Sequence, residues 1–350
     1  MNFRLSALAS LMLTCIPVCT PFVFSPAAYA ASTNTAVATP ANSALPYMRF
    51  PSSHGDNLVF TSEGDLWRAS ISGGLAQRLT TNAGEEVQAA ISPDGSQVAF
   101  VASYDGVPEA YVMPLAGGIP RRISFESTGS QVLGWSAAGE VMYSVQSQLG
   151  PNIQRVVKLV HPTTLQRRTL PLHDVYEASL SADGKTLFFT RLGLAVRQDN
   201  ARHYRGGDMA QLWRYDLGGN QEARLLSTMN AVDKQPMWHQ GRLYFISDRD
   251  GSDNLWSMKE DGSDAQQLTH ERAFDVRNAS LSNAHGKARI VYQLASNVFA
   301  YDIASATSQQ IKVQLQSDHE QMRERVLKNP LDYLTSTALA ANGERAVITA

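Results

Sequence analysis

The sequence predicts an all-β protein, a six-bladed β-propeller of four-stranded antiparallel blades, followed by the start of a second propeller. Three landmarks recur in a fixed order, at a spacing of about 45 residues that is typical of propeller repeats. They are a turn glycine between two strands, an aromatic residue in a third strand, and a short fourth strand that contains Leu or Ile. One blade cannot bury its own faces, so the copies are expected to stack around a common axis.

The clearest copy is the stretch Met237 to Thr269. Gln240-Gly241 and Asp261-Gly262 are predicted turns, and Leu255-Trp256 anchors the strand between them. Turn residues and β-rich runs that alternate in this way indicate a four-stranded antiparallel meander.

The turn glycine recurs six times, which sets the number of blades. The second copy has the most informative turn, Pro93-Asp94-Gly95, because Pro fixes φ, Asp can bond its own backbone and Gly accepts positive φ. The six glycines are Gly55, Gly95, Gly139, Gly184, Gly241 and Gly286.

The other two landmarks follow each glycine. The third-strand aromatic residues are Trp67, Tyr111, Trp213, Trp256 and Phe299. The fourth-strand segments are Arg78-Leu79-Thr80, Arg122-Ile123-Ser124, Arg224-Leu225-Leu226 and Gln267-Leu268-Thr269. The third copy is the weakest, because Arg155 to Leu159 contains no aromatic residue.

The N-terminus is predicted to be a secretory signal peptide, residues 1–30. An apolar run ends at Ala28-Tyr29-Ala30, a small-x-small cleavage site, so we expect cleavage after Ala30 and a periplasmic or secreted protein. Both cysteines of the chain, Cys15 and Cys19, lie inside this segment. The cleaved chain then needs no disulfide, and we expect no membrane span in it.

The rest of the chain divides into four predicted parts. Residues 31–46 are rich in Ala, Thr, Asn, Ser and Pro and form a disordered spacer. The propeller occupies residues 47–316, an interdomain linker 317–336, and the first strands of a second propeller 337–350. With 30 basic and 32 acidic residues the chain has no basic excess, so nucleic acid is not an expected partner.

Several stretches in order resemble the N-terminal part of tricorn-type serine peptidases. The resemblance covers roughly Tyr47 to Ala350. It rests on Gly64-Asp65-Leu66-Trp67 with Gly73-Gly74, on Ser92-Pro93-Asp94-Gly95 with Tyr111-Val112-Met113-Pro114, on Tyr204-Arg205-Gly206-Gly207, and on Asn329-Pro330-Leu331-Asp332-Tyr333-Leu334.

The resemblance implies a large peptidase that hydrolyses peptides and needs no cofactor. A six-bladed propeller would precede a seven-bladed propeller, a PDZ-like module and a catalytic core, in a homo-oligomer. The catalytic residues are expected beyond residue 350, and the chain is interpreted as an N-terminal piece that ends within a strand of the second propeller. Members of this family are often cytoplasmic, so the predicted signal peptide is a departure from it.

Two functions of different classes therefore remain open. In the first, the chain is the non-catalytic propeller of a secreted tricorn-like peptidase and acts in substrate or product gating and domain docking. In the second, it is a TolB-like periplasmic propeller that binds proteins and has no enzyme activity. The reading frame beyond Ala350 discriminates between them, because only the first requires a PDZ-like segment and a peptidase core.

No catalytic or metal site is predicted within these residues. Ser53-His54 is an adjacent pair, but adjacency in sequence does not give the geometry of a nucleophile and its base. Asp248, Asp250 and Asp253 resemble part of a calcium loop, yet the EF-hand positions for Gly and Glu hold Asp253 and Lys259. We interpret that stretch as a solvated hairpin loop.

The longest irregularity, Leu192 to Met209, is the best candidate contact site. It holds Arg197, Arg202 and Arg205, and arginines can bind carboxylates in a bidentate manner. Loops on a rigid scaffold are where binding residues concentrate. We therefore expect these three arginines to contact a peptide, another domain or another subunit.

Overall fold

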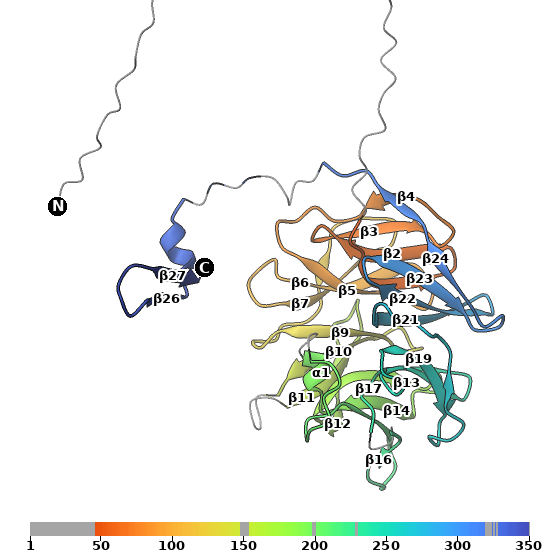
Figure 1. Cartoon of the computed structure of the whole chain (residues 1–350). Coiled ribbons are helices and arrows are strands. Elements are labelled where there is room, and N and C mark those ends of the chain that lie inside the picture. The colour runs from red at the N-terminus through yellow and green to blue at the C-terminus, as the bar shows by residue number, and fades with distance from the viewer. Residues whose placement is uncertain are drawn as a thin grey trace, which may run out of the picture. The chain divides into compact units, whose positions relative to one another are not determined.

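The computed structural model describes residues 46–147, 154–197, 201–227, 230–318, 324, 326 and 328–349. In this part of the chain, six antiparallel sheets of four consecutive strands each follow one another around a ring (Figure 1). The innermost strand of each blade contacts that of the next, and the sixth contacts the first. The predicted six-bladed propeller is therefore confirmed. The predicted signal peptide and nearly all of the spacer lie outside the described residues.

The strands have the same order in every blade, from the axis outward. The innermost strands are β1 (Arg49–His54), β5 (Glu86–Ile91), β9 (Ser130–Trp135), β13 (Val175–Leu180), β17 (Asp233–His239) and β21 (Val276–Ala284). The second strands are β2 (Asn57–Ser62), β6 (Gln97–Ala102), β10 (Val141–Gln146), β14 (Thr186–Arg191), β18 (Arg242–Ser247) and β22 (Lys287–Leu294). These second strands are the most completely buried, and together they form the inner core of the blades.

The third strands all have six residues, whereas the fourth strands vary in length. The third strands are β3 (Asp65–Ser70), β7 (Glu109–Pro114), β11 (Arg155–Val160), β15 (Gln211–Asp216), β19 (Asn254–Lys259) and β23 (Asn297–Asp302). The fourth strands are β4 (Gly73–Arg78), β8 (Arg121–Arg122), β12 (Arg167–His173), β16 (Arg224–Leu225), β20 (Gln266–Gln267) and β24 (Thr307–Ile311). A further short strand, β25 (Val313–Leu315), pairs with β4 in parallel.

The turn between the first two strands forms as its sequence indicates. Gly95 has φ of +72°, and its amide donates to the carbonyl of Ser92 at 2.9 Å. The Asp94 carboxylate accepts hydrogen bonds from the Ser92 hydroxyl at 2.5 Å and from the Ser96 amide at 3.1 Å. These bonds hold the carboxylate in its charged form and lower the pKa of Asp94 to about 2.

The third-strand aromatic residues occupy equivalent places, as predicted. Each lies opposite an aromatic residue of the second strand, in the pairs Phe60 and Trp67, Phe100 and Tyr111, Phe189 and Trp213, Phe245 and Trp256, and Tyr292 and Phe299. Trp67, Trp213 and Trp256 each pack in a cluster that joins their own blade to the preceding one. In the third blade the equivalent pair is Tyr143 and Lys158, and the missing third-strand aromatic residue explains the weak repeat there.

The fourth-strand segments end in a hydroxyl that bonds the third strand. The side chains of Thr80, Ser124, Ser227 and Thr269 accept hydrogen bonds from the backbone amides of Leu66, Ala110, Leu212 and Leu255, at 2.7–2.9 Å. The hydrogen bond of Ser227 corrects the predicted position of the fourth-strand motif in the fourth blade. Leu225, and not Arg224, lies opposite Trp213, so the motif there is Leu225-Leu226-Ser227. The sequence alone misplaced it because Arg224 mimics the arginines of the first two blades.

After the propeller, the described residues form one more small unit of structure. A 3₁₀ turn, η2 (Pro330–Tyr333), precedes a hairpin of β26 (Ser336–Leu339) and β27 (Ala346–Thr349). The turn of this hairpin contains Gly343, which has φ of +71°. Whether this hairpin opens a second propeller stays a prediction.

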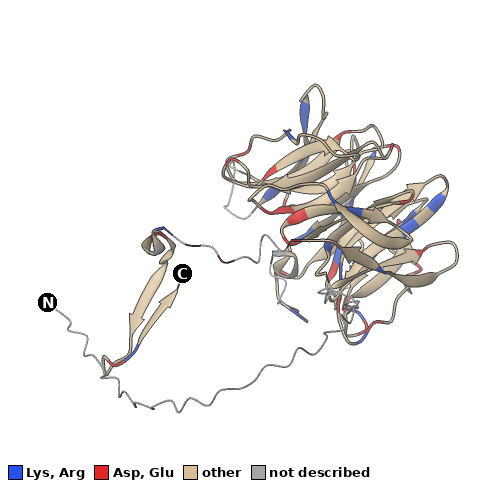
Figure 2. Ribbon diagram, turned by 90° about the horizontal axis from the view of Figure 1, so that it is seen from above, with Lys and Arg blue, Asp and Glu red and all other residues tan. Residues whose placement is uncertain are grey.

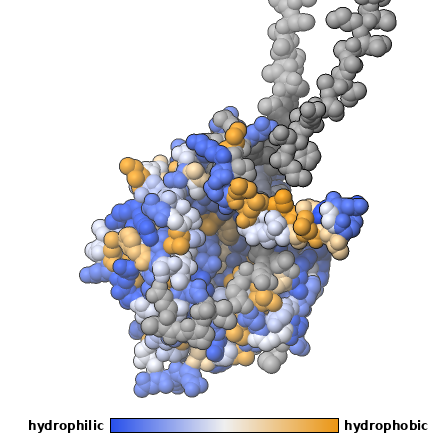
Figure 3. All heavy atoms as spheres, turned by 90° about the vertical axis from the view of Figure 1, so that its left-hand side faces the viewer, coloured by the Kyte–Doolittle hydropathy of each residue, from blue (hydrophilic) through white to orange (hydrophobic). Residues whose placement is uncertain are grey.

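The surface of the described residues carries mixed charges. Lys and Arg are interspersed with Asp and Glu over the blades (Figure 2). The face shown in Figure 3 is mainly hydrophilic, with apolar residues in smaller groups. Among the described helical segments, none is long and apolar enough to cross a membrane.

Candidate functional site

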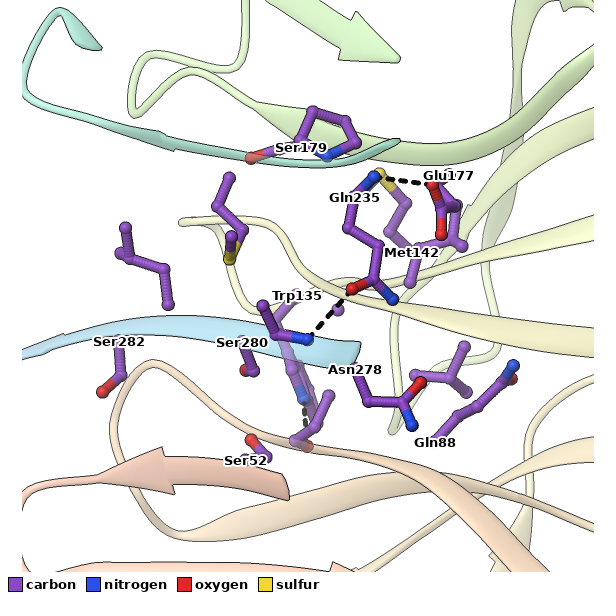
Figure 4. A pocket seen from close by; sticks show the side chains of 18 of the residues that line it. Ser52, Gln88, Trp135, Met142, Glu177, Ser179, Gln235, Asn278, Ser280 and Ser282 are labelled. Carbon is purple, nitrogen blue, oxygen red and sulfur yellow. Dashed lines mark hydrogen bonds between the residues drawn. The ribbon is translucent and has the colours of Figure 1, made fainter. Parts of the chain in front are cut away.

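The main cavity of the described part lies where the six innermost strands meet. It has a volume of about 550 Å³, within the range of ligand pockets, and all six innermost strands contribute to its wall (Figure 4). The propeller architecture creates this cavity, because the inner strands diverge around the axis and their side chains do not fill the space between them.

Each innermost strand is bulged where it faces the cavity. The pairing with the second strand shifts register once in all six blades. At these bulges Gln88, Gln235 and Asn278 have φ between +49° and +55°, a region that residues other than glycine rarely adopt. Bulges re-aim side chains, and strained backbone is concentrated at functional sites. The cavity wall is therefore the first place to look for function.

The bulges also join neighbouring blades by hydrogen bonds. The amide of Gln235 donates to Glu177 Oε2 at 2.7 Å, and the amide of Ala279 donates to Gln235 Oε1 at 3.0 Å (Figure 4). The indole Nε1 of Trp135 donates to the carbonyl of Ala90 at 2.8 Å. These bonds run between blades 4 and 5, 5 and 6, and 3 and 2, so the wall of the cavity is held in one arrangement.

The polar groups of the wall suit hydrogen bonding. Burial raises the pKa of Glu177, and hydrogen bonds from the amide of Gln235 and the hydroxyl of Thr190 act in the opposite direction. Asn278 donates to Gln293 Oε1 at 2.8 Å. Among the described residues the buried Oε1 of Gln88 has no hydrogen-bond partner, so it can accept a donor from a ligand.

Ser53-His54, at the edge of this cavity, lacks the geometry of a nucleophile and base. The hydroxyl of Ser53 lies 3.0 Å from the hydroxyl of Ser282 in blade 6. The ring of His54 stands at an edge-on angle to that of His285, with centroids 6.5 Å apart. Burial, and then His285, lower the pKa of His54. The pair therefore contributes to the junction of blades 1 and 6.

The arginine-containing loop packs on the neighbouring blades. Arg202 pairs with Asp275 and Arg205 with Asp248, each at 2.8 Å. The side chain of Arg197, at the end of α1 (Leu194–Arg197), lies outside the described residues. The carboxylates that bind Arg202 and Arg205 thus come from this propeller itself. Contact of the three arginines with a peptide, another domain or another subunit stays a prediction.

The three aspartates of the calcium-like loop are each bound by a different cation. Asp248 pairs with Arg205, Asp250 with Arg272 at 3.3 Å, and Asp253 with Lys234 at 2.8 Å. Burial raises the pKa of Asp253, although Lys234 opposes this. No group of three or more His, Cys, Asp or Glu side chains that could hold a metal ion occurs among the described residues.

Reasoning from the sequence missed the polar wall of the cavity. Its members share a place in the innermost strand, and in three blades the polar residue is followed by alanine, in Gln88-Ala89, Glu177-Ala178 and Asn278-Ala279. Aligning the strands on the turn glycines does not reveal this column, because Gln235, Gln88 and Asn278 lie six, seven and eight residues before Gly241, Gly95 and Gly286. The fifth blade also has Pro236 at the alanine position, and the third has Val132 at the polar one.

The fold and this cavity define a six-bladed β-propeller with a hydrogen-bonding wall around its axis. More particularly, the chain belongs to the tricorn protease N-terminal beta propeller domain family, whose model matches residues 45–307. It is 32% identical over 262 residues to Tricorn protease homolog 1 of Streptomyces coelicolor, an alignment that covers 73% of this chain and 23% of that protein.

Solved structures agree on the fold. A crystal structure of the tricorn protease matches with a TM-score of 0.71 at 20% identity, over 85% of this chain and 29% of that one. A TolB-type protein of Agrobacterium tumefaciens matches with a TM-score of 0.55 at 18% identity, over 71% of this chain and 91% of that one. The aligned part of this chain thus covers less than a third of each of these two tricorn proteins and most of the TolB-type chain.

Proposed function

We propose that this chain is the non-catalytic N-terminal propeller of a secreted, tricorn-like serine peptidase that degrades peptides. Its central cavity and arginine loop act in gating substrates or products and in docking the downstream domains. The observation that carries the proposal is the family match over residues 45–307, together with a wall of carboxamides and hydroxyls around the axis.

The chemistry of the wall supports a passage or binding role for peptides. Carboxamides offer both a donor and an acceptor, which is what the amide groups of an extended peptide need. The described residues hold no paired nucleophile and base, so acyl transfer is assigned to a core encoded further on. The periplasmic assignment rests on the predicted signal peptide, and N-terminal sequencing of the envelope fraction should begin at Ala31.

The test uses the complete protein and a substitution without a backbone penalty. Gln88→Gly removes the carboxamide with the free acceptor, and glycine adopts the native φ of +55° readily. We expect the KM for long peptides to change several-fold, while kcat for a short chromogenic peptide is unchanged. Gln240→Gly is the matched control, since Gln240 has φ of +46° but lies in an exposed hairpin turn. Identical kinetics of both variants for peptides of every length would show that the cavity does not act in peptide binding or passage.

The second candidate is a TolB-like propeller that binds proteins and belongs to no enzyme. It is favoured by the structural match over 91% of a TolB-type chain. The two candidates separate in a labelling experiment with a serine-directed fluorophosphonate on the envelope fraction. The first requires a labelled polypeptide that contains this propeller and a serine peptidase core, with no labelled serine among residues 31–350. A complete protein that no probe labels, and that captures partner proteins, would favour the second.

A further inference from the structure

One extended segment, Thr307 to Leu315, belongs to two blades. Its first half is β24, which pairs antiparallel with β23 of blade 6. Its second half is β25, which pairs in parallel with β4 of blade 1, with Val313 opposite Gly74 and Leu315 opposite Ala76. Figure 1 shows this end of the ring beside β4. Within the described residues, blade 1 is the sheet that gains a fifth strand, so the segment joins the last blade to the first from the outside.

The sequence of β4 is adapted to this neighbour. A Cβ atom on Gly73 would lie 2.5 Å from the carbonyl oxygen of Lys312, closer than any real contact. The amide of Gly74 donates to the same oxygen at 2.9 Å. Gly74, the next residue of β4, has φ of +100°, and Gly117, between β7 and β8 of blade 2, has φ of +101°. A Cβ atom on either would meet no atom within 4 Å. Of these three glycines, only Gly73 is therefore required by a close contact, and that contact is with the backbone of Lys312.

Alternate side chains of the segment bury apolar surface in the junction between blades 1 and 6. Ile311 and Val313 are buried in a cluster that contains Trp67 of blade 1 and Val291 of blade 6, and Leu315 packs against it. Lys312 and Gln314, between them, are exposed. A strand with this alternation buries one face and leaves the other in water.

Two polar contacts hold the segment beyond the strand. The hydroxyl of Ser317 donates to the carboxylate of Glu63, in the turn between β2 and β3. The carboxylate of Asp318 lies 4.0 Å from the guanidinium of Arg78, which also binds Asp65. Both contacts are made to blade 1, so they place the chain that follows on this blade.

We propose that the outer edge of blade 1 is a docking edge for an extended parallel strand with apolar residues at alternate positions. Its occupant is the segment from Lys312 to Asp318, here called the clasp. Docking by strand addition takes most of its binding energy from the backbone and its specificity from alternate side chains, which is the pattern seen here. The clasp closes the ring at the junction of blades 1 and 6 and fixes where the following chain leaves the propeller. This does not depend on peptidase activity.

The first test compares two glycines of β4 in the full chain. Gly73→Ala should expel the clasp, whereas Gly74→Ala carries the same strain at positive φ without the collision. We expect hydrogen exchange of the residue 74 amide to rise by about tenfold or more in the Gly73 variant, and to stay slow in the Gly74 variant. Equal protection of that amide in both variants would overturn the proposal.

The second test asks whether the edge accepts its occupant in trans. Val313→Asp with Leu315→Asp should release the clasp from the full chain and expose it to proteolysis. A synthetic peptide of residues 311–318 should then restore slow exchange at the residue 74 amide, and a scrambled peptide should not. A peptide that fails to protect a variant with native circular dichroism would contradict a docking edge.

A disulfide crosslink tests whether the clasp occupies the edge of blade 1, even if the double variant of Val313 and Leu315 does not fold. Leu75 and Gln314 are opposite one another and both exposed. Neighbouring strands are about 4.8 Å apart, within the Cα range of a disulfide. Leu75→Cys with Gln314→Cys, with Cys15 and Cys19 replaced by Ser, should form an intramolecular disulfide on oxidation and raise Tm. Thiols that stay free under oxidation would show that the clasp does not occupy this edge.

Discussion

Blades 1 and 3 share four strands and a register but differ at two equivalent positions of the third strand. In blade 1, β3 begins with Asp65 and carries Trp67 two residues later. In blade 3, the same two places of β11 are held by Val156 and Lys158, because Lys158 lies opposite Tyr143 and Tyr143 faces the preceding blade as Phe60 does. An acid and a large aromatic residue in one blade are thus replaced by an aliphatic residue and a base in the other.

The contacts change accordingly. Asp65 is buried and binds Arg78 of the fourth strand at 2.5 Å. In blade 3, Lys158 instead pairs with Glu126 at 2.9 Å, and the hydroxyl of Tyr143 donates to the same carboxylate at 2.9 Å. Val156, at the place of Asp65, is buried and apolar.

The difference teaches that the blade is specified by its backbone ladder and turns more than by any one side chain. The pairing of β10 with β11 runs through six residues without a shift, although the aromatic pair is missing. Other neighbours cover the junction of blades 2 and 3, where Tyr143 and Val160 are buried in one cluster with Ala99 and Val112 of blade 2. The side-chain landmarks therefore set how much each blade contributes to stability.

The largest effect is expected from the aromatic landmark. Trp67→Ala removes a side chain that is 2% exposed and whose indole donates to the carbonyl of Ser62 at 2.9 Å. It should lower the free energy of unfolding by about 3–5 kcal/mol. Lys158→Ala, at the same place in blade 3, should cost less, about 1–2 kcal/mol, because it removes a partly exposed ion pair with Glu126 and not a buried ring. Equal losses in chemical denaturation would break the comparison between the two blades.

These landmarks explain why the fold could be predicted and where the prediction failed. Gly, Asp and aromatic residues act locally, in a turn or across one strand pair, so their spacing is visible in the sequence. The register of blade 4 was wrong by one residue, because pairing of Trp213 with Leu225 is decided by the hydroxyl of Ser227, which the pattern did not include.

The site was harder to predict than the fold because it depends on distances across the ring. Gln88 and Asn278 come from blades 2 and 6 and meet only through closure of the propeller. The clasp was hidden for the same reason, since Gly73 and Lys312 lie at opposite ends of the ring in sequence. By contrast, the arginine loop was found by its length and composition, although its carboxylate partners Asp248 and Asp275 could not be foreseen.

The second effect concerns two partly buried arginines, Arg78 of blade 1 and Arg155 of blade 3. Arg78→Met leaves the carboxylate of Asp65 buried without its cation and should cost about 3 kcal/mol. Arg155→Met leaves only a carbonyl and a hydroxyl without a donor and should cost about 1–2 kcal/mol. Lowering the pH should recover part of the loss in the Arg78 variant, because Asp65 becomes protonated. No such recovery is expected in the Arg155 variant, and equal behaviour of both would show that the unpaired carboxylate of Asp65 is not what destabilises the Arg78 variant.

The third effect is a pH dependence at the junction of blades 1 and 2. Burial, with a smaller contribution from Asp65, raises the pKa of Glu86 to about 7, although the nearby hydroxyl of Tyr104 and the hydrogen bond from Thr80 oppose this. The folded state therefore binds the proton of Glu86 more tightly than the unfolded chain. The contribution of Glu86 to stability is fully present below about pH 4.5 and is lost as the pH rises through about 7.

Glu86→Gln should remove this slope, because the amide stays neutral. Unfolding midpoints in urea, measured at several pH values across that window, should fall with pH in the parent chain and change less in the variant. The equivalent residue of blade 3 is Ser130, and Ser130→Ala is the control that should keep the parental slope. A parental slope in the Glu86 variant would assign the titration to other groups.

The smallest effect on stability is expected from the arginine loop. The side chains of Arg202 and Arg205 are 56% and 37% exposed, and exposed ion pairs contribute about 0–1 kcal/mol each. Arg202→Ala with Arg205→Ala should therefore leave the Tm of the propeller nearly unchanged. Arg168→Ala, which removes a pair with Glu140 in blade 3 whose arginine is 50% exposed, is the matched control. The two variants are expected to differ only in the complete protein. There the loop variant should weaken assembly or raise the KM for peptides, and the blade 3 variant should do neither. A large fall in Tm for the loop variant alone would instead show that Asp248 and Asp275 use these arginines to hold blades 4, 5 and 6 together.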